Sequence, residues 1–103
     1  MIDERLNQIA DHYGLDEQLN MLQEECAELI QAVSKYRRNP TFESYAHICE
    51  EIADVEIMTE QIVYLFGKSN PTRSQVEEIK KAKIDRQNKR MDKDMKGGAK
   101  NDT

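Results

Sequence analysis

Hydrophobic residues recur along most of the chain at the spacings of three and four that place side chains on one face of an α-helix. This pattern predicts four helices, over residues 2–13, 16–38, 42–66 and 74–91. Gly14 and Gly67 mark helix ends, and Pro40 stops the second helix. Thr41 supplies an N-terminal cap, and Ser74–Glu77 has the form of a capping box. We therefore expect an all-α, four-helix bundle-like fold with one short and three longer helices.

Two carboxylate pairs lie beside the apolar stripes of the second and third helices. Glu25 lies about 60° from the centre of the first stripe, with Glu28 one step further out. Glu51 and Asp54 repeat this placement on the third helix, on the same side of its stripe. Both stripes are expected to be buried. They contain Leu15, Leu19, Leu22, Cys26, Leu29, Ile30, Val33 and Tyr36 on one helix, and Tyr45, Ile48, Ile52, Val55, Ile62, Val63 and Phe66 on the other.

The placement of these acids, and not their number, indicates a metal site. Ionised carboxylates at the margin of a core are costly unless they are paired or coordinated, and four facing acids repel one another. Carboxylate oxygens are preferred ligands of hard divalent cations. The expected cofactor is Mg²⁺, for which Mn²⁺ can substitute, held by Glu25, Glu28, Glu51 and Asp54. The alternative is a solvated acidic edge on each helix.

The charge is unevenly distributed. Residues 80–103 carry a net charge of +5, whereas residues 1–79 carry −10. The acidic body disfavours a nucleic-acid partner. We expect a single domain over residues 1–92, followed by a disordered basic tail over residues 93–103 that lacks helical periodicity. A second apolar line on the third helix, including Ile57 and Tyr64, predicts a contact in a homodimer or homotetramer, or a central helix within one bundle.

Other features of the sequence bear on the cellular location and on the roles of the cysteines and histidines. No apolar run is long enough for a membrane span, and the first residues have no secretory pattern, which predicts a cytoplasmic protein. Cys26 and Cys49 fall on or beside the stripes and are interpreted as reduced core thiols. His12 and His47 have no metal-type spacing to the cysteines, and a surface or structural role is favoured for both.

The acids also carry a family resemblance. Glu24-Glu25-x-x-Glu28 followed by Glu51-x-x-Asp54 resembles the EExxE…ExxD signature of the MazG-like nucleoside triphosphate pyrophosphohydrolases, in the all-α NTP pyrophosphatase superfamily. The resemblance covers roughly residues 15–90. It implies an oligomeric helical bundle that cleaves a (d)NTP between the α- and β-phosphates, with Mg²⁺, to a nucleoside monophosphate and pyrophosphate. It also implies that the four acids are catalytic metal ligands.

The resemblance implies further roles on the last helix. Lys83, Arg86 and Arg90 share one face and would bind the phosphates. Some members have a lysine where this chain has His47, and Glu24 lies about 100° from Glu25. Apart from the resemblance, we interpret a water molecule as the nucleophile, with Glu28 as the candidate base.

Three alternatives stay open. A di-iron carboxylate bundle would need Glu-x-x-His on two helices, and neither histidine follows a glutamate at that spacing. A non-enzymatic helical regulator would use the basic C-terminal helix, which leaves the acid pairs unexplained. A protein of the same fold could bind nucleotides without cleaving them. The regulator and the nucleotide-binding protein are the non-enzymatic alternatives to a hydrolase.

Overall fold

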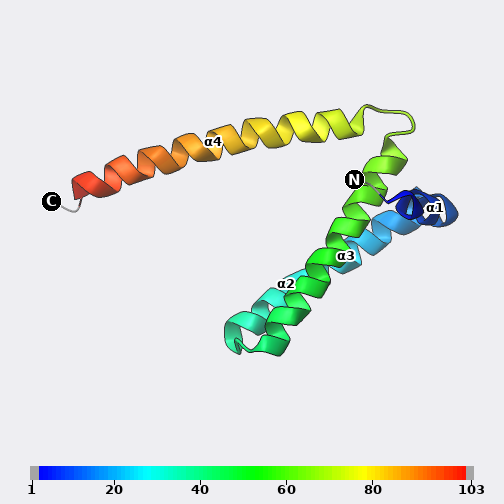
Figure 1. Cartoon of the computed structure of the whole chain (residues 1–103), viewed down its shortest axis with the longest axis horizontal. Helices are drawn as coiled ribbons and strands as arrows, with labels where there is room; N and C mark the ends of the chain where they lie inside the picture. Colours follow the sequence, from blue (N-terminus) through cyan, green and yellow to red (C-terminus); the bar gives the residue numbers. More distant parts are fainter. Residues whose placement is uncertain (1–2, 102–103) are drawn as a thin grey trace. The chain divides into compact units, whose positions relative to one another are not determined.

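The computed structural model describes the backbone of residues 3–101 and the side chains of residues 3–97. Its helices are α1 (Glu4–Tyr13), α2 (Leu15–Arg38), α3 (Phe42–Phe66) and α4 (Thr72–Asn101), and the described residues contain no strand (Figure 1). This confirms the all-α, bundle-like fold with one short and three longer helices. The chain divides into two units, Met1–Asn70 and Pro71–Thr103, and each is described by itself. The single domain predicted over residues 1–92 stays a prediction.

One glycine separates α1 from α2. Gly14 has a φ of 85°, a conformation that glycine adopts without the strain a Cβ would bring. Its N–H donates to the carbonyl of Ala10 at 2.8 Å, and its own carbonyl accepts from the N–H of Gln18 at 3.1 Å. The predicted end of the first helix at Gly14 is confirmed, and α2 begins at the next residue.

A short turn with a capping box joins α2 to α3. The Thr41 Oγ1 accepts from the backbone N–H of Ser44 at 3.1 Å, and the Ser44 Oγ accepts from the N–H of Thr41 at 2.9 Å. The predicted cap at Thr41 is therefore confirmed. Because the turn is so short, α2 and α3 run antiparallel and pack against each other along their length (Figure 1).

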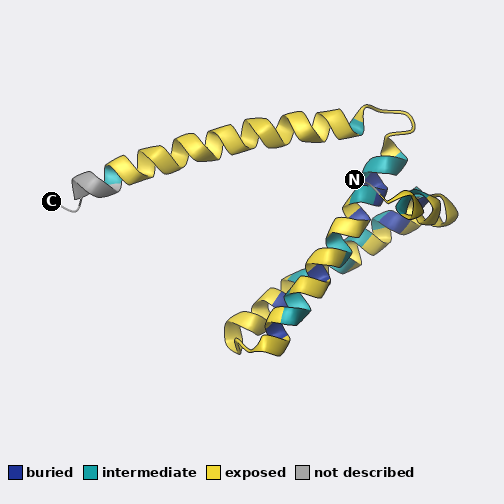
Figure 2. Ribbon diagram, in the orientation of Figure 1, coloured by how far each residue is buried: buried dark blue, intermediate teal, exposed yellow. Residues whose placement is uncertain are grey.

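The buried line between α2 and α3 passes through polar and charged residues. Gln18 and Ala32 are buried on α2, and Ser44, Glu51 and Met58 are buried on α3 (Figure 2). Members of each set are seven or fourteen residues apart and so lie on one helix face. The contact between the helices is therefore centred on the acid side of each helix, about 60° from the predicted stripe centre.

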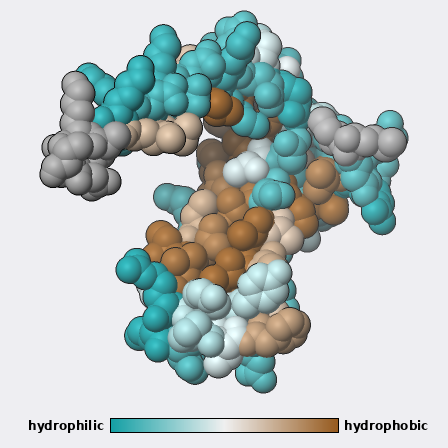
Figure 3. Space-filling view, turned by 60° about the vertical axis from the view of Figure 1, so that its left-hand side comes forward, coloured by the Kyte–Doolittle hydropathy of each residue, from teal (hydrophilic) through white to brown (hydrophobic). Residues whose placement is uncertain are grey.

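The apolar stripes are only partly covered within the unit Met1–Asn70, which corrects the prediction that they are buried. Ile30 is 68% exposed and Ile52 is 43% exposed, and both lie on the side of their helices away from the acids. Figure 3 shows apolar side chains gathered along the α2–α3 hairpin. We call the following residues the uncovered apolar face: Ile30, Val33, Tyr36, Tyr45, Ile52 and Phe66. The apolar residues of each helix lie on two faces, which the sequence pattern does not separate. Only one of these faces packs inside the unit.

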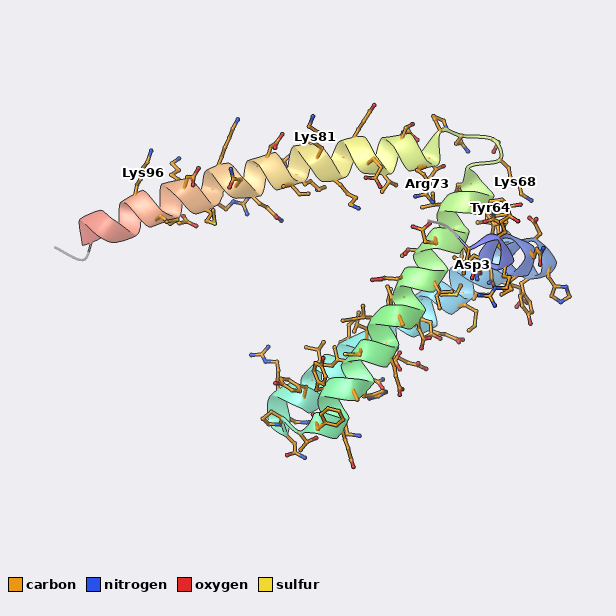
Figure 4. The ribbon with its side chains drawn as sticks, in the orientation of Figure 1. Asp3, Tyr64, Lys68, Arg73, Lys81 and Lys96 are labelled. Atoms are coloured by element: carbon orange, nitrogen blue, oxygen red, sulfur yellow. The ribbon has the colours of Figure 1, made fainter. Side chains whose placement is uncertain are left out.

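A polar cluster ties α1 to the end of α3. The Tyr64 hydroxyl donates to the Asp11 carboxylate at 2.7 Å, and the Lys68 ammonium donates to the other oxygen of that carboxylate (Figure 4). The hydrogen bond from Lys68, followed by that from Tyr64, lowers the pKa of Asp11. The predicted end of the third helix at Gly67 is confirmed, with Gly67 in a right-handed conformation.

The α4 helix begins and ends differently from its prediction. It starts at Thr72, so Ser74 lies inside the first turn, where its hydroxyl donates to the Pro71 carbonyl at 3.1 Å and does not form the predicted capping box. The helix also continues past Met91 to Asn101, because this stretch contains several strong helix formers. The predicted disordered tail is helical as far as it is described, and residues 102 and 103 lie outside the described residues.

Candidate metal centre

The antiparallel arrangement of α2 and α3 brings the two acid pairs together. Each pair occupies adjacent turns of its helix, and the chain reverses direction between them. Glu25, Glu28 and Glu51 can each place one carboxylate oxygen so that all three atoms lie within 4.8 Å of one another. Asp54 lies beside Glu25, close enough for its negative charge to raise the pKa of Glu25. The structure thus gathers all four predicted acids, three of them in one group.

The three glutamates form a gradient from the interior to solvent. Glu51 is buried, with 6% of its surface exposed, Glu25 is half-buried and Glu28 is exposed. Glu24 is also exposed and is not a member of the group. The group is therefore open to solvent on the Glu28 side and closed on the Glu51 side. A cation could enter and keep some of its waters, as Mg²⁺ prefers.

Two carboxylate oxygens inside this group have no protein partner. The Oε2 atoms of Glu25 and Glu51 are both buried, and neither accepts a hydrogen bond from any described residue. A buried acceptor left unsatisfied costs about 1–3 kcal/mol, and more when it carries charge. A divalent cation is a partner that carboxylate oxygens of this kind accept. The residues present therefore fit a hard cation.

The electrostatic surroundings of Glu25 also favour a bound cation. Burial is the largest cause that raises its pKa above the usual 4.5, followed by the negative charges of Asp54, Glu28 and Glu51. A raised pKa means that the folded protein disfavours the ionised carboxylate. A positive charge at the same place would reverse this preference.

His47 contacts the most buried acid of the group. Its Nε2 lies 3.2 Å from the Oε1 of Glu51, one helical turn further along α3, and its side chain is partly exposed. Sequence reasoning favoured a surface or structural role for this histidine. The spacing of four between His47 and Glu51 was the signal that could have found the contact, because residues at that spacing share a helix face.

The three basic residues predicted to bind phosphate belong to the other unit. Lys83, Arg86 and Arg90 are exposed on α4 and share one of its faces. Figure 4 shows two further lysines, Lys81 and Lys96, projecting from the same helix. Their role in binding phosphate stays a prediction.

A buried amide pair near the start of the α2–α3 hairpin was missed by sequence reasoning. The Gln18 side-chain amide donates from Nε2 to the side-chain Oε1 of Gln61, and both residues are buried. Neither residue is distinguished by its neighbours in the sequence, since a glutamine at helix spacing is usually a surface residue. The pair links the start of α2 to the last turns of α3 inside the unit Met1–Asn70.

Neither cysteine belongs to the group of possible metal ligands found among the described residues. Both are free thiols, Cys26 half-buried and Cys49 exposed. The prediction of a core position is therefore wrong for Cys49, because this side of α3 is not covered within the unit. No described helix combines the length and the apolar character that a bilayer crossing requires. Comparison with protein-family models, with curated proteins and with solved structures found no match.

Proposed function

We propose that the protein is a Mg²⁺-dependent nucleotide pyrophosphohydrolase that cleaves a (d)NTP between its α- and β-phosphates to a (d)NMP and pyrophosphate. The observation that carries the proposal is the pair of buried, unpartnered carboxylate oxygens of Glu25 and Glu51, contributed by two helices to one acidic group. A donor set made only of carboxylates favours Mg²⁺ or Mn²⁺ over softer metals. The family resemblance of the acid pairs supplies the substrate class.

The role proposed for each acid depends on how far its side chain is buried. Glu25 and Glu51 would hold the cation from the closed side, and Asp54 would be a further ligand beside Glu25. Glu28 is exposed and would accept a proton from the attacking water. Bound Mg²⁺ would supply charge neutralisation for the triphosphate. From the resemblance, Lys83, Arg86 and Arg90 would bind the phosphates.

The net reaction is hydrolysis of one anhydride bond. The water oxygen joins one of the two phosphorus atoms that flank the α–β bridge, and the bridging P–O bond breaks. The electron pair of that bond leaves with the other product, and the water proton passes to the carboxylate base. No redox partner or covalent enzyme intermediate is required.

We also propose that the functional form is a homodimer or homotetramer. The uncovered apolar face supports this, because an apolar surface of this kind on a small chain is stabilised by a partner. A second copy presents an identical face, as a two-fold symmetric interface requires. A cytoplasmic location is a separate proposal from the sequence, and the free thiols support it.

Product analysis tests the enzymatic proposal. The purified protein is incubated with a panel of standard and modified (d)NTPs and Mg²⁺, and the expected products are a nucleoside monophosphate and pyrophosphate. Glu51→Gln should abolish turnover, whereas Glu24→Gln, a change of the same kind at an exposed neighbour, should not. Release of orthophosphate would refute the mechanism, and full activity of Glu51→Gln would refute the ligand assignment.

A non-enzymatic role is the alternative. The exposed cations of α4 favour a regulator or nucleotide-binding protein that uses this helix. This alternative predicts nucleotide or nucleic-acid binding that weakens steeply with salt and is lost when α4 is truncated, with no turnover of any nucleotide. Retained turnover after substitution of the α4 cations would contradict it.

A further inference from the structure

The two oxygens of the Glu51 carboxylate have different surroundings. Oε1 lies 3.2 Å from the Nε2 of His47, within reach of a hydrogen bond. Oε2 is buried and has no partner among the described residues. The Glu51 side chain is 8% exposed, while the His47 side chain is 44% exposed. One oxygen thus contacts a side chain, and the other has no partner among the described residues.

We propose that His47 is a positioning residue for the metal site: by donating from Nε2 to one oxygen of Glu51, it fixes the carboxylate so that the other oxygen faces the cation. The inference rests on the proposed function, because it needs a cation between Glu25 and Glu51. A ligating carboxylate usually accepts a hydrogen bond from an outer residue, and loss of such a partner typically weakens metal affinity about 10–100-fold.

Geometry favours this role over direct coordination by His47. The ligand atoms that come within 4.8 Å of one another belong to Glu25, Glu28 and Glu51, and among the described residues His47 does not join that group. Its Nε2 is also the atom that faces Glu51 Oε1. An imidazole that donates there keeps Glu51 from rotating, whereas an unheld carboxylate would exchange its two oxygens.

The same contact gives His47 a role different from that of a phosphate-binding cation. A lysine at this position would reach outward with a flexible stem and a permanent charge. The shorter histidine is engaged by a buried acid on its own helix. Substitution of His47 should therefore change the affinity for the metal alone, in the absence of any nucleotide.

Metal binding by three variants tests the proposal. The probe is Mn²⁺ alone, titrated into the protein and followed by electron paramagnetic resonance of the unbound ion. His47→Leu removes the donor, His47→Gln places an amide donor at a comparable reach, and His12→Leu changes the other histidine, on α1. Circular dichroism and melting of the metal-free proteins establish that each variant is folded.

We expect His47→Leu to weaken Mn²⁺ binding about 10–100-fold while its metal-free helicity is unchanged. His47→Gln should recover most of the affinity, and His12→Leu should bind like the wild type. Wild-type affinity in His47→Leu would overturn the inference, as would equal losses in the leucine and glutamine variants.

Failure of the proposed function has a separate signature. Wild-type protein that binds Mn²⁺ in a His47-dependent way but hydrolyses no nucleotide would refute the hydrolase and support the positioning role. Wild-type protein that binds no Mn²⁺ would overturn both.

Discussion

Binding of a divalent cation should raise the melting temperature of the protein, and Glu51→Gln should abolish the rise. In the metal-free chain, two buried carboxylate oxygens lack partners, at about 1–3 kcal/mol each. Their combined cost is about 2–6 kcal/mol, a large share of the stability of a small domain. A cation that binds only the folded hairpin relieves this cost.

The size of the effect follows from the linkage between binding and folding. At a free cation concentration of 100 times Kd, the native state gains about 2.7 kcal/mol. One kcal/mol corresponds to about 4–8 °C for a domain of the size of the unit Met1–Asn70. The melting temperature should therefore rise by about 11–22 °C between protein treated with a chelator and protein saturated with Mn²⁺.

The assay is thermal unfolding followed by circular dichroism at a fixed protein concentration, because self-association would also shift the transition. Glu51→Gln should melt at the same temperature with and without the cation, since the buried ligand has lost its charge. Glu24→Gln should keep the full shift. A wild-type melting temperature that does not change between chelator and saturating cation would refute the argument from the orphaned oxygens.

Three further predictions test the electrostatics, the apolar face and the amide pair. Because the pKa of Glu25 is raised in the folded protein, its contribution to the stability of the metal-free protein is present below pH 4.5 and is lost as the pH rises through the folded pKa. The free energy of unfolding, measured by chemical denaturation, should therefore fall over this pH range. Glu25→Gln should remove that fall. Ile30→Glu or Ile52→Glu should convert an oligomer to monomers in light scattering, and an unchanged mass would refute a contact through this face. Gln61→Leu should cost about 1–3 kcal/mol by leaving the Gln18 amide unpaired, and adding Gln18→Leu should restore most of it; equal losses in the single and double variants would contradict this account.

Local signals predicted where the helices begin and end, except in α4. Gly14, Pro40, Thr41 and Gly67 act on the backbone next to them, so their effect could be predicted from the sequence without knowledge of the fold. The capping box at Ser74 failed because the turn at Pro71 begins the helix earlier and uses the serine differently. The end near Met91 failed because weak periodicity was interpreted as disorder, although a stretch without an apolar face can still be helical.

The direction in which each helix faces could be predicted only in part. The angle between acid and stripe was predicted to be the same on both helices, and this is what brings Glu25 and Glu51 to one place. Which side of the stripe packs inside the unit could not be predicted, because periodicity adds together all the faces a helix buries. The contact of His47 with Glu51 required the fold to show which acid is buried.

The position of the acids at the centre of the α2–α3 contact is itself an argument about the site. Burying the charge of Glu51 carries a large desolvation cost. An apolar residue at this position would avoid that cost and stabilise the hairpin. Residues that are unfavourable for packing, such as a buried carboxylate, usually occur at functional sites. The buried line of α3 places Glu51 between Ser44 and Met58, where packing alone favours no carboxylate. The proposed hard cation would remove the conflict, because it requires negative charge at this point and takes carboxylate oxygens as its preferred ligands.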